Sequence, residues 1–220
     1  SHPAARALLR RLGEPIAAPS ANRSGRPSPT TAAHALKDLD GRVPLVLDGG
    51  PCRRGLESAI VDARGRRPVL LRPGTITAEA LARAAGVAAA APGRSSPASP
   101  GSRHRHYAPS CRIVLVPPAL LRSGRVAGLG LPGTGLLHRA RWKGRMPAFA
   151  RRVPGGAANY ARGLFGALRE AEDANVRVLF VETVPERGVG RAVMDRLRRA
   201  AEGVKGRGAA RHGMMDVGSS

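Results

Sequence analysis

Small polar side chains gather in a loop at residues 15–31, around a short apolar run at residues 16–18. The loop places Ser20, Asn22 and Thr30 among glycine and several prolines. Hydroxyl and amide groups beside a flexible glycine can hold phosphates or a small polar ligand against backbone N–H groups. The same residue types dominate ordinary turns. Taken alone, the loop therefore predicts either a ligand-binding loop or a plain turn.

Two further polar loops follow predicted strands. An apolar strand at 43–48 leads into a loop at 47–65 that contains Ser58, and a strand at 68–71 places Arg72 at its exit. Because open α/β sheets collect ligand groups in the loops at the ends of their strands, we expect the three loops to converge. The planar fork of Arg72 suits phosphate. The alternative is that Arg72 is one more surface arginine in an arginine-rich chain.

The 220-residue chain has a formal net charge of +22, and nearly all of its positive charge is arginine. Its length predicts one or two domains. A hydrophobic content of 42% excludes disorder throughout, and an aromatic content of 3% indicates a core of Leu, Val and Ala. The charge is typical of proteins that bind nucleic acid or another anionic surface, but GC-rich coding also yields arginine-rich chains. Both explanations stay open.

Two cysteines, Cys52 and Cys111, stand apart from each other and from any second cluster of metal ligands. They are expected to be reduced thiols, neither a disulfide nor a metal site. No apolar run approaches the roughly 18 residues that span a membrane, and no secretory signal is evident. We therefore expect a cytoplasmic protein with no membrane partner.

The hydrophobic periodicity predicts an α/β protein with a linker. Before the linker we expect helices at 2–13, 31–39 and 77–86, with strands at 16–18, 43–48 and 68–71. After the linker we expect a strand at 112–116, a helix at 155–174, a strand at 176–184 and a helix at 190–201. This order suggests a small Rossmann-like layer. The GLGLPGTG segment formally fits G-x-G-x-x-G, but Pro132 and the lack of a following periodic helix favour a plain loop.

Several separated segments together resemble the threonylcarbamoyl-AMP synthase family, which has a YrdC-like catalytic domain. They are PIAAPSANRSG, LDGGPC, GLESAIVD, LLRPGTIT, HYAP, NYARGLFGALREAE and GVGRAVMDRLRRAA. The resemblance implies a partial YrdC-like twisted α/β sheet domain, a linker and a second domain, the small Rossmann-like α/β layer, and the lack of periodicity in the last residues predicts a disordered tail. The corresponding ranges are 1–90, 91–110, 111–202 and 203–220. It also implies that the N-terminal half of the catalytic domain, with its Lys-x-Arg strand motif, is absent from this chain.

The resemblance further implies a reaction: threonine, bicarbonate and ATP, with Mg²⁺, give threonylcarbamoyl-AMP and pyrophosphate for the threonylcarbamoyladenosine modification of tRNA. No residue is expected to act covalently or as an acid or base, and none to bind a metal. Glu57 and Asp62 are expected to be structural. The residues that would bind ATP are Asn22, Thr30, Arg72, His106 and Tyr107, and those that would bind threonine are His2, Ser20 and Ser58.

Two other functions remain open at this stage. The first is an inactive, truncated member of the same family. The second is a non-catalytic RNA-binding protein that uses its arginine surface and binds less tightly as salt rises. Partner proteins of tRNA modification are expected for the enzyme, and the resemblance leaves open whether the chain contacts tRNA directly.

Overall fold

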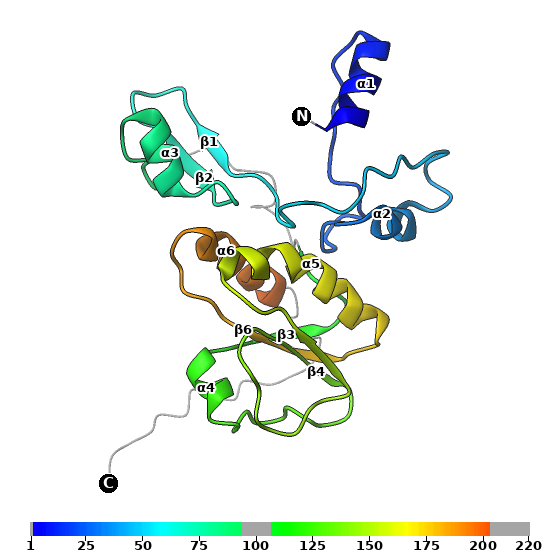
Figure 1. Ribbon diagram of the computed structural model, residues 1–220, viewed down its shortest axis with the longest axis vertical. Helices are drawn as coiled ribbons and strands as arrows, with labels where there is room; N and C mark the ends of the chain where they lie inside the picture. The colour runs from blue at the N-terminus through cyan, green and yellow to red at the C-terminus, as the bar shows by residue number, and fades with distance from the viewer. Residues whose placement is uncertain (1, 94–106, 203–220) are drawn as a thin grey trace.

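The computed structural model describes residues 2–93 and 107–202 (Figure 1). We call these stretches the N-terminal region and the C-terminal region. The predicted tail at 203–220, most of the predicted linker, and His106 lie outside the described residues. Within the two regions, no helix is both long enough and apolar enough to cross a membrane.

The C-terminal region is a parallel α/β layer. Its elements are β3 (Arg112–Val116), α4 (Pro118–Arg122), β4 (Thr134–His138), β5 (Phe149–Arg152), α5 (Ala157–Asp173), β6 (Val178–Glu182) and α6 (Val189–Glu202). The strands lie in the order β3-β6-β4-β5, and each neighbouring pair is parallel. The predicted Rossmann-like layer is therefore confirmed. Helix α4 and strands β4 and β5 were not predicted, because α4 is very short, β4 follows directly on the glycine-rich loop and β5, FARR, is a mostly exposed edge strand.

Both faces of this sheet are covered (Figure 1). On one face, α5 and α6 pack against Leu137 and Leu179. On the other face, Leu121 of α4 packs with Leu136 and Phe180. Successive residues of a strand point to opposite faces, which is why Leu136 and Leu137 belong to different clusters although both are completely buried. The main hydrophobic core of the chain lies in this region.

Helix α5 has the apolar stripe that its sequence predicts. Tyr160, Leu164, Phe165 and Leu168 are each no more than 1% exposed. The Tyr160 hydroxyl donates a hydrogen bond to the carbonyl of Glu182 at 3.0 Å, at the end of β6. Burial raises the pKa of this phenol above its usual value. The neutral hydroxyl thus remains a donor that ties α5 to the sheet.

The N-terminal region has short elements and little sheet. They are α1 (Pro3–Leu12), α2 (Ala32–Leu39), β1 (Ile60–Asp62), β2 (Val69–Arg72) and α3 (Ala78–Ala85), with β1 and β2 paired antiparallel. The three predicted helices are confirmed. The caps are local: the Thr31 and Thr77 hydroxyls accept hydrogen bonds from backbone N–H groups three residues on, and Gly86 ends α3 with a φ of 69°.

Two predicted strands in this region are wrong, and one was missed. Residues 16–18 and 43–48 are not strands, and Leu45 and Leu47 are 71% and 64% exposed. Apolar residues of high strand propensity form a strand only where a neighbouring strand pairs with their backbone, and no described residue does so here. Strand β1 lies inside the second polar loop, where no separate apolar segment marked it.

Candidate ligand site between the two regions

The first and second polar loops meet at a cavity of about 460 Å³ that opens between the N-terminal region and α5. The cavity is lined by Ser20, Ala21, Ser28, Pro29, Thr30, Cys52, Arg53, Arg54, Gly55, Leu56, Glu57 and Phe165. Two of the site residues predicted from the sequence, Ser20 and Thr30, therefore line the same cavity. Hydroxyls and arginines around a cavity of this size suit an anionic ligand.

Thr30 is held in place by a histidine of α2. Its backbone N–H donates to Nδ1 of His34 at 3.2 Å, and its hydroxyl lies 3.2 Å from the same nitrogen. Burial, followed by the charge of Arg169, lowers the pKa of His34. The imidazole is thus neutral, with Nδ1 as the acceptor. Thr30, at 9% exposed, is consequently fixed at the edge of the cavity.

Asn22 shapes the first loop. Its Nδ2 donates to the carbonyls of Arg23 at 2.8 Å and Arg26 at 3.3 Å. Its Oδ1 is buried and has no hydrogen-bond partner among the described residues. A buried acceptor without a partner is costly, so this oxygen is a place where a ligand donor would add a bond. Asn22 does not, however, line the 460 Å³ cavity.

Arg72 ties the third loop to the second. Its Nε and Nη2 donate to the carbonyl of Ser58 at 3.2 and 3.1 Å, and the side chain is almost fully buried. The Ser58 side chain is exposed. Gly74, two residues after Arg72, lies so close to Ala59 that a Cβ would come within 2.0 Å of the Ala59 nitrogen. The structure therefore brings Arg72 and Ser58 together, but through a backbone contact.

His2 lies apart from the cavity. It precedes α1, is exposed, and its Nε2 is 3.1 Å from the carbonyl oxygen of Gly49. Helix α1 stands away from the other helices in Figure 1. Of the predicted threonine-binding residues, only Ser20 lines the cavity.

Arg196 of α6 reaches the second loop from the C-terminal region. This fully buried side chain donates from Nε to Oε2 of Glu57 at 3.0 Å and from Nη1 to the carbonyl of Pro73 at 2.8 Å. The other carboxylate oxygen of Glu57 accepts a hydrogen bond from the Ser28 hydroxyl at 2.5 Å. Both carboxylate oxygens of Glu57 are thus engaged in contacts within the protein. Arg196 is a site residue that sequence reasoning missed, because one arginine is inconspicuous in so arginine-rich a helix.

Tyr107, from the HYAP segment, is packed in the same place. The Arg196 guanidinium lies 5.4 Å from the centre of its ring, and the ring stacks on Phe165 at 5.5 Å. Tyr107 adopts a φ of 65°, which is unusual for a residue other than glycine. Burial, followed by the negative charge of Glu57, raises the pKa of its hydroxyl. The HYAP segment, the second loop and α6 therefore meet beside the cavity.

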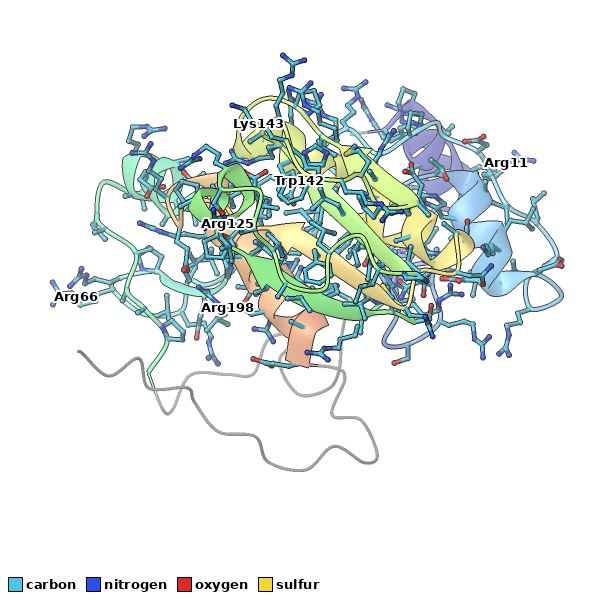
Figure 2. All side chains as sticks on the ribbon, turned by 90° about the horizontal axis from the view of Figure 1, so that it is seen from below. Arg11, Arg66, Arg125, Trp142, Lys143 and Arg198 are labelled. Atoms are coloured by element: carbon cyan, nitrogen blue, oxygen red, sulfur yellow. The ribbon has the colours of Figure 1, made fainter. Side chains whose placement is uncertain are left out.

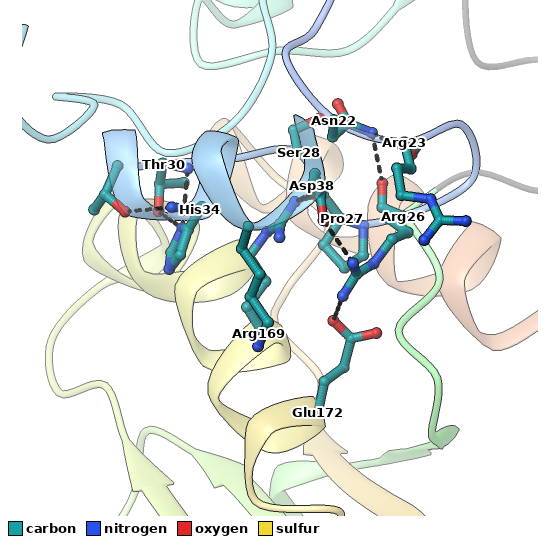
Figure 3. Close-up of polar contacts among 12 residues, drawn as sticks. Asn22, Arg23, Arg26, Pro27, Ser28, Thr30, His34, Asp38, Arg169 and Glu172 are labelled. Carbon is teal, nitrogen blue, oxygen red and sulfur yellow. Dashed lines mark hydrogen bonds and ion pairs between the residues drawn. The ribbon is translucent and has the colours of Figure 1, made fainter. Parts of the chain in front are cut away.

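A second buried ion cluster joins the first loop to α5 (Figure 3). The Asp38 carboxylate accepts from Arg26 at 2.5 Å and from Arg169 at 2.6 Å, and Arg26 also contacts Glu172 at 2.9 Å. Burial opposes ionisation of Asp38, but the hydrogen bond and charge of Arg169 and the charge of Arg26 outweigh it. The pKa of Asp38 is consequently below its usual value. Arg169 also donates to the carbonyl of Pro27 at 2.6 Å.

Arginines outside the predicted site also lie at the cavity. Arg53 and Arg54 line it, and both are exposed. An adjoining cavity of about 550 Å³ shares Thr30 and Arg53 with it and adds Arg162 of α5. Arg162 donates to the carbonyl of Arg53 at 3.1 Å. For Arg53 and Arg54, the signal available in the sequence was their position directly after LDGGPC, one of the segments that carries the family resemblance.

Comparison with known proteins gives one consistent result. A family model described as "Threonylcarbamoyl-AMP synthase, C-terminal domain" matches residues 76–202, and one described as "Telomere recombination" matches residues 1–74. The chain is 39% identical over 212 residues to a threonylcarbamoyl-AMP synthase of Bacillus subtilis, covering 92% of this chain and 61% of that protein. It is 35% identical over 220 residues to one of Pyrococcus abyssi, covering 91% and 62%.

Solved structures agree with these matches. The crystal structure of P. abyssi Sua5 complexed with L-threonine superposes with a TM-score of 0.74 at 35% identity, covering 89% of this chain and 60% of that one. A variant of that protein in which a histidine and a tyrosine are replaced by alanine gives the same TM-score at 31% identity, covering 92% and 61%. The chain thus spans about three fifths of the length of the relatives that it matches.

Proposed function

Because the chain belongs to the threonylcarbamoyl-AMP synthase family, we propose that it acts in the synthesis of threonylcarbamoyl-AMP from threonine, bicarbonate and ATP. The product would serve the threonylcarbamoyladenosine modification of tRNA. The observation that carries the proposal is the cavity between the two regions, where Ser20, Thr30 and two arginines surround one space. We expect the reaction to take place in the cytoplasm.

ATP would bind with its phosphates toward Arg53 and Arg54. Guanidinium groups form strong, charge-assisted hydrogen bonds with phosphate. Thr30 would lie beside the phosphates, and Asn22 would contact the nucleotide from the same loop. Arg72 would act by holding the second and third loops together, with its charge close to the site. Tyr107 and His106 would contact the nucleotide from the side of the linker.

Threonine would bind near Ser20. The P. abyssi protein has been crystallised with L-threonine, and this chain follows that structure over most of its length. Ser20 is the predicted threonine-binding residue that lines the cavity. Ser58 and His2 are proposed to complete the threonine site from the second loop and the start of α1.

The chemistry would need positioning more than reactive side chains. The threonine amine and bicarbonate combine with loss of water to form a carbamate, and a carbamate oxygen then attacks the α-phosphorus of ATP. The bond to the β-phosphate breaks and pyrophosphate leaves. Arginines beside the phosphates would neutralise the charge that develops in this transfer. Enclosure of the bound reactants would align them and exclude water from the labile product.

Mg²⁺ would accompany ATP, as in other nucleotidyl transfers. The described cavity lining does not fit a metal held by the protein. Glu57 is its carboxylate, and both oxygens of Glu57 already accept hydrogen bonds, from Ser28 and Arg196. We therefore assign no residue to the metal and derive no step through it.

Pyrophosphate release that requires both threonine and bicarbonate is the direct test. ATP titration of the chain adds a binding measurement. Replacing Arg53 and Arg54 together by Gln should weaken ATP binding about ten- to a hundredfold, since hydrogen bonds to charged groups contribute roughly 1.5–3 kcal/mol. Replacing Arg10 and Arg11 of α1 by Gln, the matched control, should leave ATP binding unchanged. Equal weakening in both variants, or no ATP binding by the folded chain, would contradict the proposal.

A further inference from the structure

Acidic residues are missing from the central part of the sequence. No aspartate or glutamate stands between Glu79 and Glu170, although arginines continue throughout this stretch. A bias toward arginine codons raises the arginine content of the whole chain. That codon bias gives no reason for aspartate and glutamate to be confined to the sequence before and after this stretch. The separation of charge therefore points to a surface selected for an anionic partner.

The structure gathers part of this stretch on one side of the C-terminal sheet. The loop RARWKGRMPA at residues 139–148, which we call the basic loop, joins β4 to β5. Figure 2 looks from below at the α4 side of the sheet, and Trp142, Lys143 and Arg125 are labelled on that side. Arg125, Arg141, Lys143 and Arg145 are all exposed. The basic loop and Arg125, in the segment after α4, thus form one cationic face.

The exposed cations of this face differ from the buried arginines that join the two regions. Arg169 and Arg196 have carboxylate partners in the buried contacts between the two regions. In the basic loop, Arg139 lies 3.5 Å from the Glu182 carboxylate. Within residues 2–93 and 107–202, no ion pair is formed by Arg125, Arg141, Lys143 or Arg145. Their charges face solvent and are available to a polyanion.

Trp142 fixes the shape of the basic loop. It is the only tryptophan of the chain, and it packs against the hydrophobic cluster on the α4 side of the sheet. Its indole N–H donates to the carbonyl of Arg145 at 3.0 Å. The loop folds so tightly over the ring that a Cβ on Gly144 would lie 2.2 Å from it. The loop is thereby held against the sheet while Arg141, Lys143 and Arg145 extend outward, and part of the indole remains exposed.

We propose that the basic loop, with Arg125, binds RNA. Exposed cations that flank a partly exposed aromatic ring match the combination that single-stranded nucleic acid uses, phosphate contacts plus stacking of a base. Arginine outnumbers lysine in the loop, and its planar group both pairs with phosphate and stacks on bases. A membrane surface would favour a long amphipathic helix with an apolar face, and this loop has none.

Titration with a fluorescently labelled single-stranded RNA tests the proposal, followed both by anisotropy and by the intrinsic fluorescence of Trp142. RNA should quench Trp142, and the affinity should fall steeply with salt. Each phosphate contact on a single strand contributes about 0.7 to the slope of log K against log salt. Replacing Arg141, Lys143 and Arg145 by Gln should therefore lower that slope by about 2. The matched control replaces Arg6, Arg10 and Arg11 of α1, also exposed, and should leave the slope unchanged.

Several results would overturn the proposal. One is an equal loss of RNA affinity in the α1 variant and the loop variant. Another is RNA binding that leaves Trp142 fluorescence unchanged. Stronger quenching by anionic lipid vesicles, or by a single-stranded DNA of the same sequence, would assign the surface to a different partner. RNA binding that survives in the Arg53→Gln, Arg54→Gln variant would support a surface separate from the ATP site, and its loss there would contradict it.

Discussion

In the C-terminal region, Leu136, Leu137 and Leu179 are completely buried between helices and sheet, whereas in the N-terminal region Leu45 and Leu47 are mostly exposed. The hydrophobic side chains that the described structure fully buries all lie at or after Tyr107. The N-terminal region has a two-stranded sheet, and the C-terminal region has a four-stranded sheet covered on both faces.

The comparison shows that the two regions are stabilised in different ways. The C-terminal region has its own hydrophobic core. The loops of the N-terminal region are held by charged contacts with the other region, through Asp38 to Arg169 and through Glu57 to Arg196. The candidate site lies along this seam. Its geometry thus depends on a few buried ion pairs, and these can be broken one at a time.

Removing Arg169 should have the largest effect. Arg169→Met leaves the Asp38 carboxylate, which has no exposed side-chain surface, with Arg26 as its remaining described charge partner. Breaking a buried ion pair costs about 3–5 kcal/mol. Urea unfolding should show this loss. The exposed pair between Lys37 and Asp173 joins the same elements, so Lys37→Gln should cost less than about 1 kcal/mol. Equal losses in the two variants would show that burial does not matter here.

The next largest difference between the two regions should come from replacing one leucine in each region by alanine. Leu179→Ala should lower the free energy of unfolding by about 2–5 kcal/mol, because it leaves a cavity in a closed core. Leu45→Ala should change it by no more than about 0.5 kcal/mol, because Leu45 already faces solvent. Thermal and urea unfolding of both variants measure the difference. A large loss for Leu45→Ala would mean that this side chain is buried in solution.

Gly55 offers a smaller and more local test of the seam. It has a φ of 71°, and a Cβ at this position would lie 2.3 Å from the carbonyl oxygen of Arg162 on α5. Gly41 has a similar φ of 68° with nothing within 4 Å. Gly41→Ala should cost about 1–2 kcal/mol for the left-handed backbone alone. Gly55→Ala should cost more in urea unfolding and should also weaken ATP binding. Equal costs would show that the two regions separate easily at this point.

Acid should weaken the same seam by a smaller amount. The folded-state pKa of Asp38 is below its usual value, so the unfolded chain, with a pKa of about 3.9, binds the proton more readily. The stabilisation is complete above about pH 5 and is lost as the pH falls through the folded-state pKa. Urea unfolding midpoints measured as a function of pH should show this acid-dependent loss of stability in the wild-type chain, and Asp38→Asn should abolish it. The lowered pKa of His34 affects stability in a separate pH range, below about 6.5, where the imidazole of the unfolded chain binds a proton more readily than that of the folded chain.

Five of the six described helices were predictable from the sequence, and several strands were not. Helices α2 and α3 carry threonine caps, and α5 has a continuous apolar stripe, so their signals lie within one turn or one face. The segment at 43–48 has the composition of a strand but no strand beside it. Strand β5 has a partner but no apolar run, since three of its four residues are exposed at the sheet edge. Pairing is a property of two segments, which a local pattern does not contain.

The candidate site was predictable in part, for the same reason. Ser20 and Thr30 could be chosen because their hydroxyls suit a polar ligand and because they lie in or beside segments that carry the family resemblance, and both line one cavity. Arg169 and Arg196 could not be chosen, because among so many arginines residue type alone carries no information. Their roles depend on which carboxylate, carbonyl or cavity lies within reach.

The sequence by itself determined the positions of α1, α2, α3, α5 and α6, the parallel α/β character of residues 112–202 and the family to which the polar loops point. These follow from hydrogen bonds, caps and periodicity within short stretches of chain. Only the tertiary structure decided that α6 supports the second loop, that α5 supports the first, and that the basic loop is pinned by Trp142. Those contacts join residues far apart in the chain, and their free energy depends on burial that exists only after folding.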